Sequence, residues 1–195
     1  HFTADGSAVG RIERVFHRLS LDPEEAGPEI VRLEYDLRHK VEDGLALAAS
    51  FHEYVSDTAL PPLVQCWACW TVGMVEAPYL DIGKRLALAS RALQCAEAVQ
   101  SDYASATAAL LVADVLFEHG RPGDHDKALG HYRRSLEVRE RLLVANPESA
   151  QAARDVSVSL GRLADFLASR GLPGDAEQAL GHYRRSLEVR ERLLV

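Results

Sequence analysis

Hydrophobic residues recur at helical spacing along almost the whole chain, and hardly any segment alternates apolar and polar residues as a half-buried strand does. This pattern predicts an all-α fold of about eight helices. The segment 21–28, which contains two prolines, is expected to separate the first two helices, and Gly44 is expected to kink or split the second. The expected helices cover residues 7–20, 28–56, 61–76, 81–99, 102–119, 125–145, 148–170 and 176–195.

The clearest feature of the sequence is an internal repeat. The segment from Ala128 to Val144 returns without a change as Ala179 to Val195, at an offset of 51 positions. The preceding turn also returns, since Gly120 to Asp124 reappears with one change as Gly171 to Asp175. Repetition at such a period is typical of helical solenoids. Each unit is therefore expected to be a helix, a glycine-rich turn and a second helix.

The residues around the turns predict where these helices end and begin. Gly171 suits the left-handed position just past a helix end. Asp175 is expected to cap the following helix, with the Gln178 side chain returning the bond. Between the two units, Asn146 is expected to be an N-cap and Pro147 the first helical residue.

The second helix of each unit is amphipathic. Its apolar side, which is expected to face the core, consists of Leu129, Tyr132, Leu136, Leu142 and Leu143. On the outer side, Arg133, Glu137 and Arg141 follow one another at intervals of four and can form a ladder of ion pairs. The arginines could instead bind phosphate or nucleic acid. We favour a solvated face, because glutamates on the same helix offset the positive charge.

The repeat resembles the tetratricopeptide repeat (TPR), which has a Leu-Gly-x-x-Tyr core on its first helix and Ala-x-x-x-Phe on its second. The matching positions are Leu163, Ala164 and Leu167, then Val112, Ala113 and Leu116, and the pairs Ala128 with Tyr132 and Ala179 with Tyr183. The family's Trp position holds Ala109 and Leu160, and the period is longer than the usual one of about 34 residues. The unit is thus most similar to the long-helix variety of kinesin light chains and bacterial tandem arrays. The resemblance covers residues 101–195 and implies a right-handed α-solenoid of antiparallel helix hairpins.

In that family the first helix of each unit lines a concave face that holds a peptide, so the resemblance implies a binding groove. The groove positions hold Thr107, Leu110, Asp114, Phe117 and Glu118 in one unit, and Val158, Gly161, Asp165, Ala168 and Ser169 in the next. Two aspartates, Asp114 and Asp165, replace the Asn and Lys that bind a terminal carboxylate in chaperone-binding members. Carboxylates there would favour basic or neutral ligands. Alternatively, both aspartates are solvated helix residues.

Residues 1–100 match the repeat less well, and we expect them to form a terminal cap or degenerate repeats. His1 is not a natural start and Val195 falls inside a repeat, so we expect the chain to be a fragment of a longer protein. Further repeats, another subunit or a partner would then cover the apolar side of the last helix.

Charge and hydropathy exclude some classes of function. The net charge is −7, which argues against general binding to nucleic acids or anionic membranes. No apolar run reaches the length of a membrane span, and no signal peptide is visible. Three cysteines, read as reduced thiols, fit a cytoplasmic protein.

Cys66 and Cys69 have a spacing found in redox couples and in half of a zinc site. No βαβ context supports redox chemistry, and Cys95 would be one further ligand where two are needed. We therefore expect these thiols to pack as small hydrophobic residues beside Trp67 and Trp70. No nucleophile, base and acid fall together in a recognisable motif, so we expect no catalytic residue, no metal and no cofactor.

These observations predict a protein–protein interaction module, a scaffold or sensor part of a larger bacterial protein. In bacterial proteins that resemble this one, such arrays often accompany a signalling or defence domain. One alternative is a structural element that assembles with itself through the open face of its C-terminal repeat. Another is a metal- or redox-dependent regulator that acts through the three cysteines.

Overall fold

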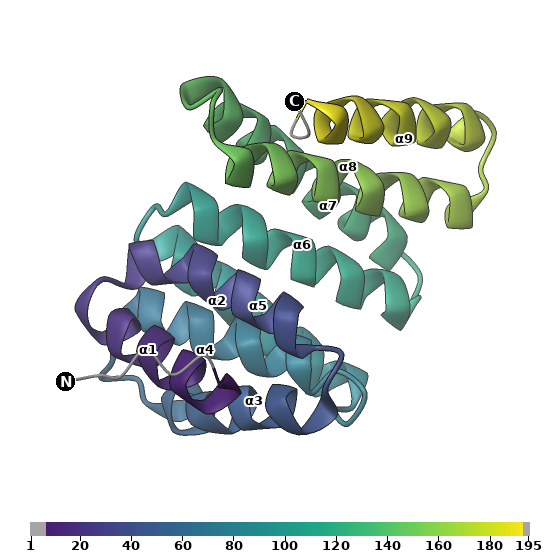
Figure 1. The fold of residues 1–195 in the computed structure, drawn as a ribbon. Coiled ribbons are helices and arrows are strands. Elements are labelled where there is room, and N and C mark those ends of the chain that lie inside the picture. Colours follow the sequence, from purple (N-terminus) through teal and green to yellow (C-terminus); the bar gives the residue numbers. More distant parts are fainter. Residues whose placement is uncertain (1–6, 193–195) are drawn as a thin grey trace. The chain divides into compact units, whose positions relative to one another are not determined.

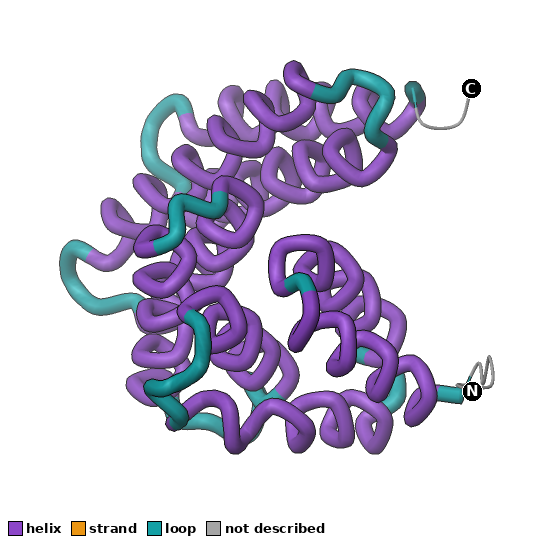
Figure 2. Tube along the Cα trace, turned by 90° about the vertical axis from the view of Figure 1, so that its left-hand side faces the viewer, coloured by secondary structure: helices purple, strands orange, loops and turns teal. Residues whose placement is uncertain are grey.

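The computed structural model describes residues 7–192, and all the regular structure in that range is helical (Figures 1 and 2). The prediction of an all-α fold is confirmed, although the described residues contain nine helices where about eight were expected. They are α1 (Ala8–Leu21), α2 (Pro23–Leu37), α3 (Val41–Ser56), α4 (Pro62–Val75), α5 (Ile82–Ala98), α6 (Asp102–His119), α7 (Asp124–Ala145), α8 (Ala150–Arg170) and α9 (Asp175–Glu191).

The extra helix arises because the expected helix 28–56 is two helices. The break lies at residues 38–40, so the expectation that Gly44 would interrupt the helix was wrong. Gly44 lies in the first turn of α3, where its N–H donates to the Lys40 carbonyl at 3.0 Å. A glycine costs a helix only about 1 kcal/mol relative to alanine, and α3 is held by its packing against α4.

The start of α2 also differs from the prediction. Segment 21–28 separates the first two helices as predicted, but the break is confined to Asp22, and residues 23–28 already belong to α2. Asp22 caps α2 by accepting a hydrogen bond from the Glu25 N–H at 3.2 Å, and Pro23 occupies the first helical turn. Proline suits that position because its missing N–H would have no helical partner there.

The chain divides into two compact units, residues 1–108 and 109–195, with the boundary inside α6. In the first unit α4 is the central helix, because every residue from Leu63 to Gly73 is buried. A helix that is apolar all round needs neighbours on every side. Helices α2, α3 and α5 all pack against α4.

Trp67 joins α4 to α2 within this first unit. Its indole is 1% exposed, and its Nε1–H donates to the Pro23 carbonyl at 3.0 Å. The indole lies against the backbone of Gly27, where a Cβ atom would come within 2.2 Å of the ring. Glycine at this position therefore lets the two helices approach closely.

In the second unit, α8 packs between α7 and α9, and each neighbouring pair runs antiparallel. Residues early in α8 meet residues late in α9, as in the contact of Ser157 with Ser186. Residues late in α8 meet the start of α9, as in the ion pair of Arg170 with Asp175. The neighbouring helices of this unit pack side by side as in a helical solenoid (Figure 1).

The two glycine-rich turns of the repeat have the same backbone geometry. Gly120 and Gly171 have φ of +62° and +66°, and Gly123 and Gly174 have φ of +85° and +86°. Only glycine adopts these left-handed conformations without strain. The expectation for Gly171 is thus confirmed.

Two expected helix caps were wrong. Gly174 is the N-cap of α9, and Asp175 is already its first helical residue. Likewise Ser149 caps α8 by accepting from the Ala152 N–H at 3.1 Å, while Asn146 and Pro147 lie in the turn before it. Sequence patterns locate such boundaries to within a few residues, and a serine caps as well as an asparagine.

Candidate functional site

Both predicted groove aspartates make the same contact, 51 residues apart. The Tyr132 hydroxyl of α7 donates to Asp114 of α6 at 2.7 Å, and the Tyr183 hydroxyl of α9 donates to Asp165 of α8 at 2.5 Å. Burial and then the nearby Asp114 carboxylate raise the pKa of Tyr132. The hydrogen bond to Asp165 raises the pKa of Tyr183. Both tyrosines therefore stay protonated donors, and both aspartates help hold their helix pair together.

A second pair of carboxylates stabilises the turn between α6 and α7 and the turn between α8 and α9. Asp124 lies 2.7 Å from the His119 ring and accepts the Arg121 N–H, while Asp175 accepts two hydrogen bonds from Arg170 at 2.7 and 2.8 Å. The Arg170 hydrogen bond is the main reason why the pKa of the Asp175 carboxyl is lowered. A charged, bidentate pair of this kind fixes the angle between α8 and α9.

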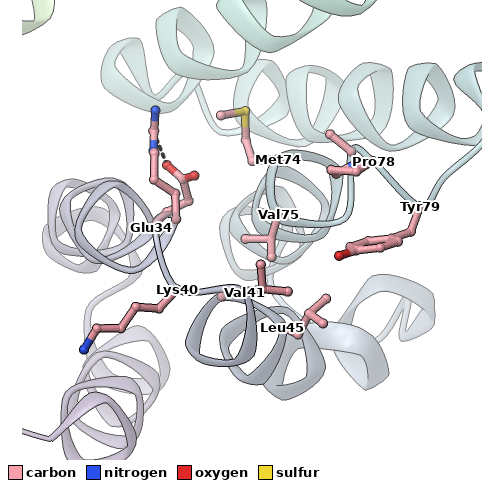
Figure 3. Close-up of a pocket in the computed structure, with 11 residues that line it drawn as sticks. Glu34, Lys40, Val41, Leu45, Met74, Val75, Pro78 and Tyr79 are labelled. Atoms are coloured by element: carbon pink, nitrogen blue, oxygen red, sulfur yellow. Dashed lines mark hydrogen bonds and ion pairs between the residues drawn. The ribbon is translucent and has the colours of Figure 1, made fainter.

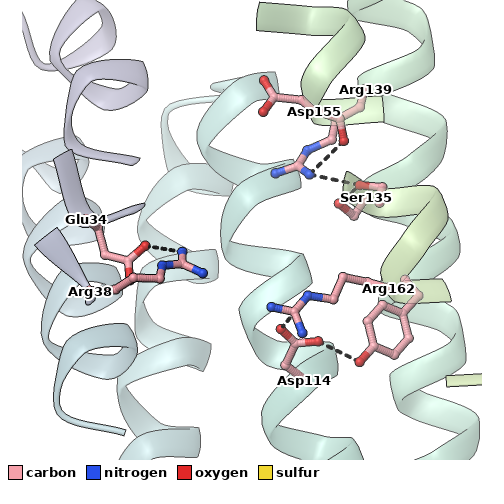
Figure 4. Close-up of polar contacts among 9 residues, drawn as sticks. Glu34, Arg38, Asp114, Ser135, Arg139, Asp155 and Arg162 are labelled. Atoms are coloured by element: carbon pink, nitrogen blue, oxygen red, sulfur yellow. Dashed lines mark hydrogen bonds and ion pairs between the residues drawn. The ribbon is translucent and has the colours of Figure 1, made fainter. Parts of the chain in front are cut away.

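The predicted groove residues differ widely in exposure. Thr107 and Leu110 are buried, and the Phe117 ring is packed edge-on against Phe166 at 5.3 Å. Asp114 is mostly covered, with the Arg162 side chain 3.9 Å from its carboxylate (Figure 4). The exposed members of the set are Glu118, Val158, Asp165, Ala168 and Ser169. Gly161 is partly exposed.

Five of the exposed residues of α8 form one continuous face, which we call the α8 face: Arg154, Val158, Arg162, Asp165 and Ser169. They recur at intervals of three and four and so share one side of the helix. Sequence reasoning missed Arg154 and Arg162. They could have been found from Val158, because Arg154 lies one helical turn before it and Arg162 one turn after it. The α8 face therefore presents an apolar side chain among charges of both signs.

Arg139 of α7 departs from the prediction of a wholly solvated arginine face. It is 4% exposed and donates to the Asp155 carbonyl at 3.1 Å and the Ser159 hydroxyl at 2.9 Å (Figure 4). A guanidinium can be buried when its N–H groups find acceptors. The expected outer ladder is represented by Arg141 with Glu137, an exposed pair whose closest atoms are 4.0 Å apart.

The first unit has a half-open cavity of about 300 Å³ (Figure 3). Figure 3 shows Val41, Leu45 and Val75 gathered near the Tyr79 ring. At another wall Glu34, only 4% exposed, pairs with Arg38 at 2.6 Å. The cavity thus combines apolar walls with the ion pair of Glu34 and Arg38, and Lys40 also lines it.

The cysteines lie in the first unit. Cys66 and Cys69 are fully buried and Cys95 is partly exposed, as free thiols. Burial raises the pKa of Cys66, and it raises that of Cys69 to about 11. Both therefore stay protonated at neutral pH, and both are buried in α4, the helix that also carries Trp67 and Trp70. Within residues 7–192 no group of three or more His, Cys, Asp or Glu side chains could hold a metal ion.

No protein-family model matches the chain, and a search of curated proteins finds no relative. Among the helices of residues 7–192, none has both the length and the apolar character needed to cross a membrane.

Proposed function

We propose that the chain is a TPR-like interaction module that binds a protein or peptide on the side formed by the first helices of its repeats. The main support is that the hairpin α6–α7 and the hairpin α8–α9 repeat the same glycine conformations and the same tyrosine–aspartate bond. Equivalent hairpins that stack against each other build an extended surface, which suits binding better than catalysis. In this proposal the array is a right-handed solenoid, part of a larger bacterial signalling or defence protein.

The α8 face is the centre of the proposed site. Val158 is 38% exposed and offers an apolar contact, and Asp165 keeps an exposed carboxylate although it accepts the Tyr183 hydrogen bond. Glu118 adds a second exposed carboxylate from α6. A ligand with an apolar side chain beside a basic or neutral group would satisfy these features. Thr107 and Leu110 are buried, so neither is part of the proposed contact surface.

The test is a selection of peptides from a random displayed library against the purified protein, followed by calorimetry with each selected peptide. Val158→Ser removes the apolar contact, and Asp165→Asn removes the charge but keeps an oxygen that can accept from Tyr183. We expect each change to weaken binding by about tenfold. Glu137→Gln, on the exposed side of α7, is the matched control. Failure to select any peptide, or peptides that bind both variants normally, would refute the proposal.

Self-assembly is the second candidate function, and it is supported by apolar side chains that α9 leaves exposed. Measuring molecular mass against protein concentration separates self-assembly from ligand binding, because assembly without any ligand favours self-assembly. A regulator that acts through the cysteines has less support, since Cys66 and Cys69 are buried and protonated.

A further inference from the structure

The repeat places one amino-acid sequence in two different environments. Helices α7 and α9 have identical sequences from Ala128 and Ala179 onward. Each makes the same tyrosine–aspartate bond to the helix before it. What differs among the described residues is the helix that follows, because α7 is followed by α8, which packs against it. A difference in exposure between matching residues therefore includes what α8 covers, beside a contact of α9 itself with α7 through the ion pair of Arg185 with Glu140 at 2.7 Å.

That difference is large and lies on one side of the helix. Tyr132 is 2% exposed and its match Tyr183 is 37% exposed, while Leu136 is 7% exposed and Leu187 is 57% exposed. Leu180, one turn before Tyr183, is 48% exposed. We call Leu180, Tyr183 and Leu187 the α9 stripe. Their intervals of three and four residues place them on one face of α9.

Helix α8 packs on α7 through three specific contacts, one of which involves Tyr132, the match of Tyr183. The Phe166 ring packs against Tyr132 with the ring centres 5.3 Å apart. Ser159, seven residues earlier on α8, meets Ser135 at 3.3 Å and accepts from Arg139 at 2.9 Å. An aromatic ring and a serine two turns before it thus share the side of α8 that faces α7.

We infer that the α9 stripe is a docking site for a partner helix that carries this α8 pattern, an aromatic residue with a serine seven positions before it. The aromatic ring packs on Tyr183, the apolar turns around it cover Leu180 and Leu187, and the serine accepts from Arg190. Arg190 is exposed in α9, whereas its match Arg139 is buried. The Nε–H of Arg190 already donates to Ser157 at 2.6 Å, so the partner serine would accept from the other N–H groups of the guanidinium. The site is separate from the α8 face, so it stands or fails independently of the proposed function.

A second copy of the chain does not supply this pattern. Its own Phe166 and Ser159 are fully buried between helices of the same unit. An α9 from another copy has no phenylalanine, and its Ser186 is 5% exposed and bonded to Ser157. The complementary groups must therefore come from a different helix.

The experiment uses a synthetic peptide with the α8 sequence, Ala150 to Arg170, labelled with a fluorophore and titrated with the whole chain. We expect saturable binding, and hydrogen exchange should show added protection in α9 and none in α7. The Phe166→Ala change in the peptide and the Leu187→Ser change in the protein should each weaken binding by about tenfold or more. Leu187 is exposed, so its replacement leaves the fold intact, which circular dichroism would verify.

The matched control is Glu188→Gln, the neighbouring exposed residue of α9, which should bind the peptide like the unchanged protein. Three results would overturn the inference: no binding at about millimolar peptide, equal binding by the Leu187→Ser protein, or added protection in α7 instead of α9. Sedimentation of the chain alone tests whether a second copy of the chain occupies the α9 stripe. Self-association that Leu187→Ser abolishes would show that a second copy fills the site.

Discussion

Replacing Gly27 by alanine tests the close approach of α2 and α4. The added Cβ atom would lie 2.2 and 2.7 Å from two atoms of the Trp67 ring. Carbon atoms pack at about 3.5–4.0 Å, so the ring must shift by more than about 1 Å. Trp67 is 1% exposed and has no open space to move into, and a shift would break the Nε1–H hydrogen bond to Pro23.

The size of the effect follows from opposing contributions. Overpacking in a core costs about 1–3 kcal/mol, and leaving a buried N–H without its acceptor costs about 1–3 kcal/mol. Alanine in place of glycine in a helix gains back about 1 kcal/mol. We therefore expect Gly27→Ala to lower the free energy of unfolding by about 2–4 kcal/mol. The clash with Trp67 makes the substitution destabilising, although alanine is the better helix former.

Urea unfolding followed by circular dichroism measures this change, and Gly130→Ala is the matched control. A Cβ atom at Gly130 of α7 meets no atom within 4 Å, so the same substitution there should stabilise the protein by about 0.5–1 kcal/mol. The reasoning about Trp67 would be refuted if Gly27→Ala were neutral or stabilising.

Two further predictions concern the repeat. Leu136→Ala should cost about 2–4 kcal/mol of unfolding free energy, whereas Leu187→Ala at the matching exposed position should cost under about 1 kcal/mol; similar losses in urea unfolding would contradict the unequal cover of α7 and α9. The lowered pKa of Asp175 stabilises the folded state above the unfolded carboxyl pKa of about 3.9, and this contribution is lost as pH falls through the folded pKa. The melting temperature of Asp175→Asn should therefore lie further below that of the unchanged protein at pH 7 than at pH 3, and an equal difference at both would count against the ion pair.

Local sequence signals predicted much of the fold. The left-handed φ of Gly171 follows from glycine between two helices, and the burial of α4 follows from its unbroken apolar run. The helix break at residues 38–40 and the cap at Ser149 were missed, because weak local preferences there compete with tertiary packing. Whether the predicted groove residues bind a ligand stays a prediction.

The sequence by itself determined that a two-helix unit recurs, because glycine, apolar spacing and identity at an offset of 51 positions are properties of the chain alone. Only the tertiary structure decided which side chains of each copy are buried and which are exposed. Arg139 is buried and Arg190 is exposed, and Tyr132 is covered where Tyr183 is not, although their sequence surroundings are the same. Exposure depends on which helix packs alongside, and identical segments carry no information about their neighbours.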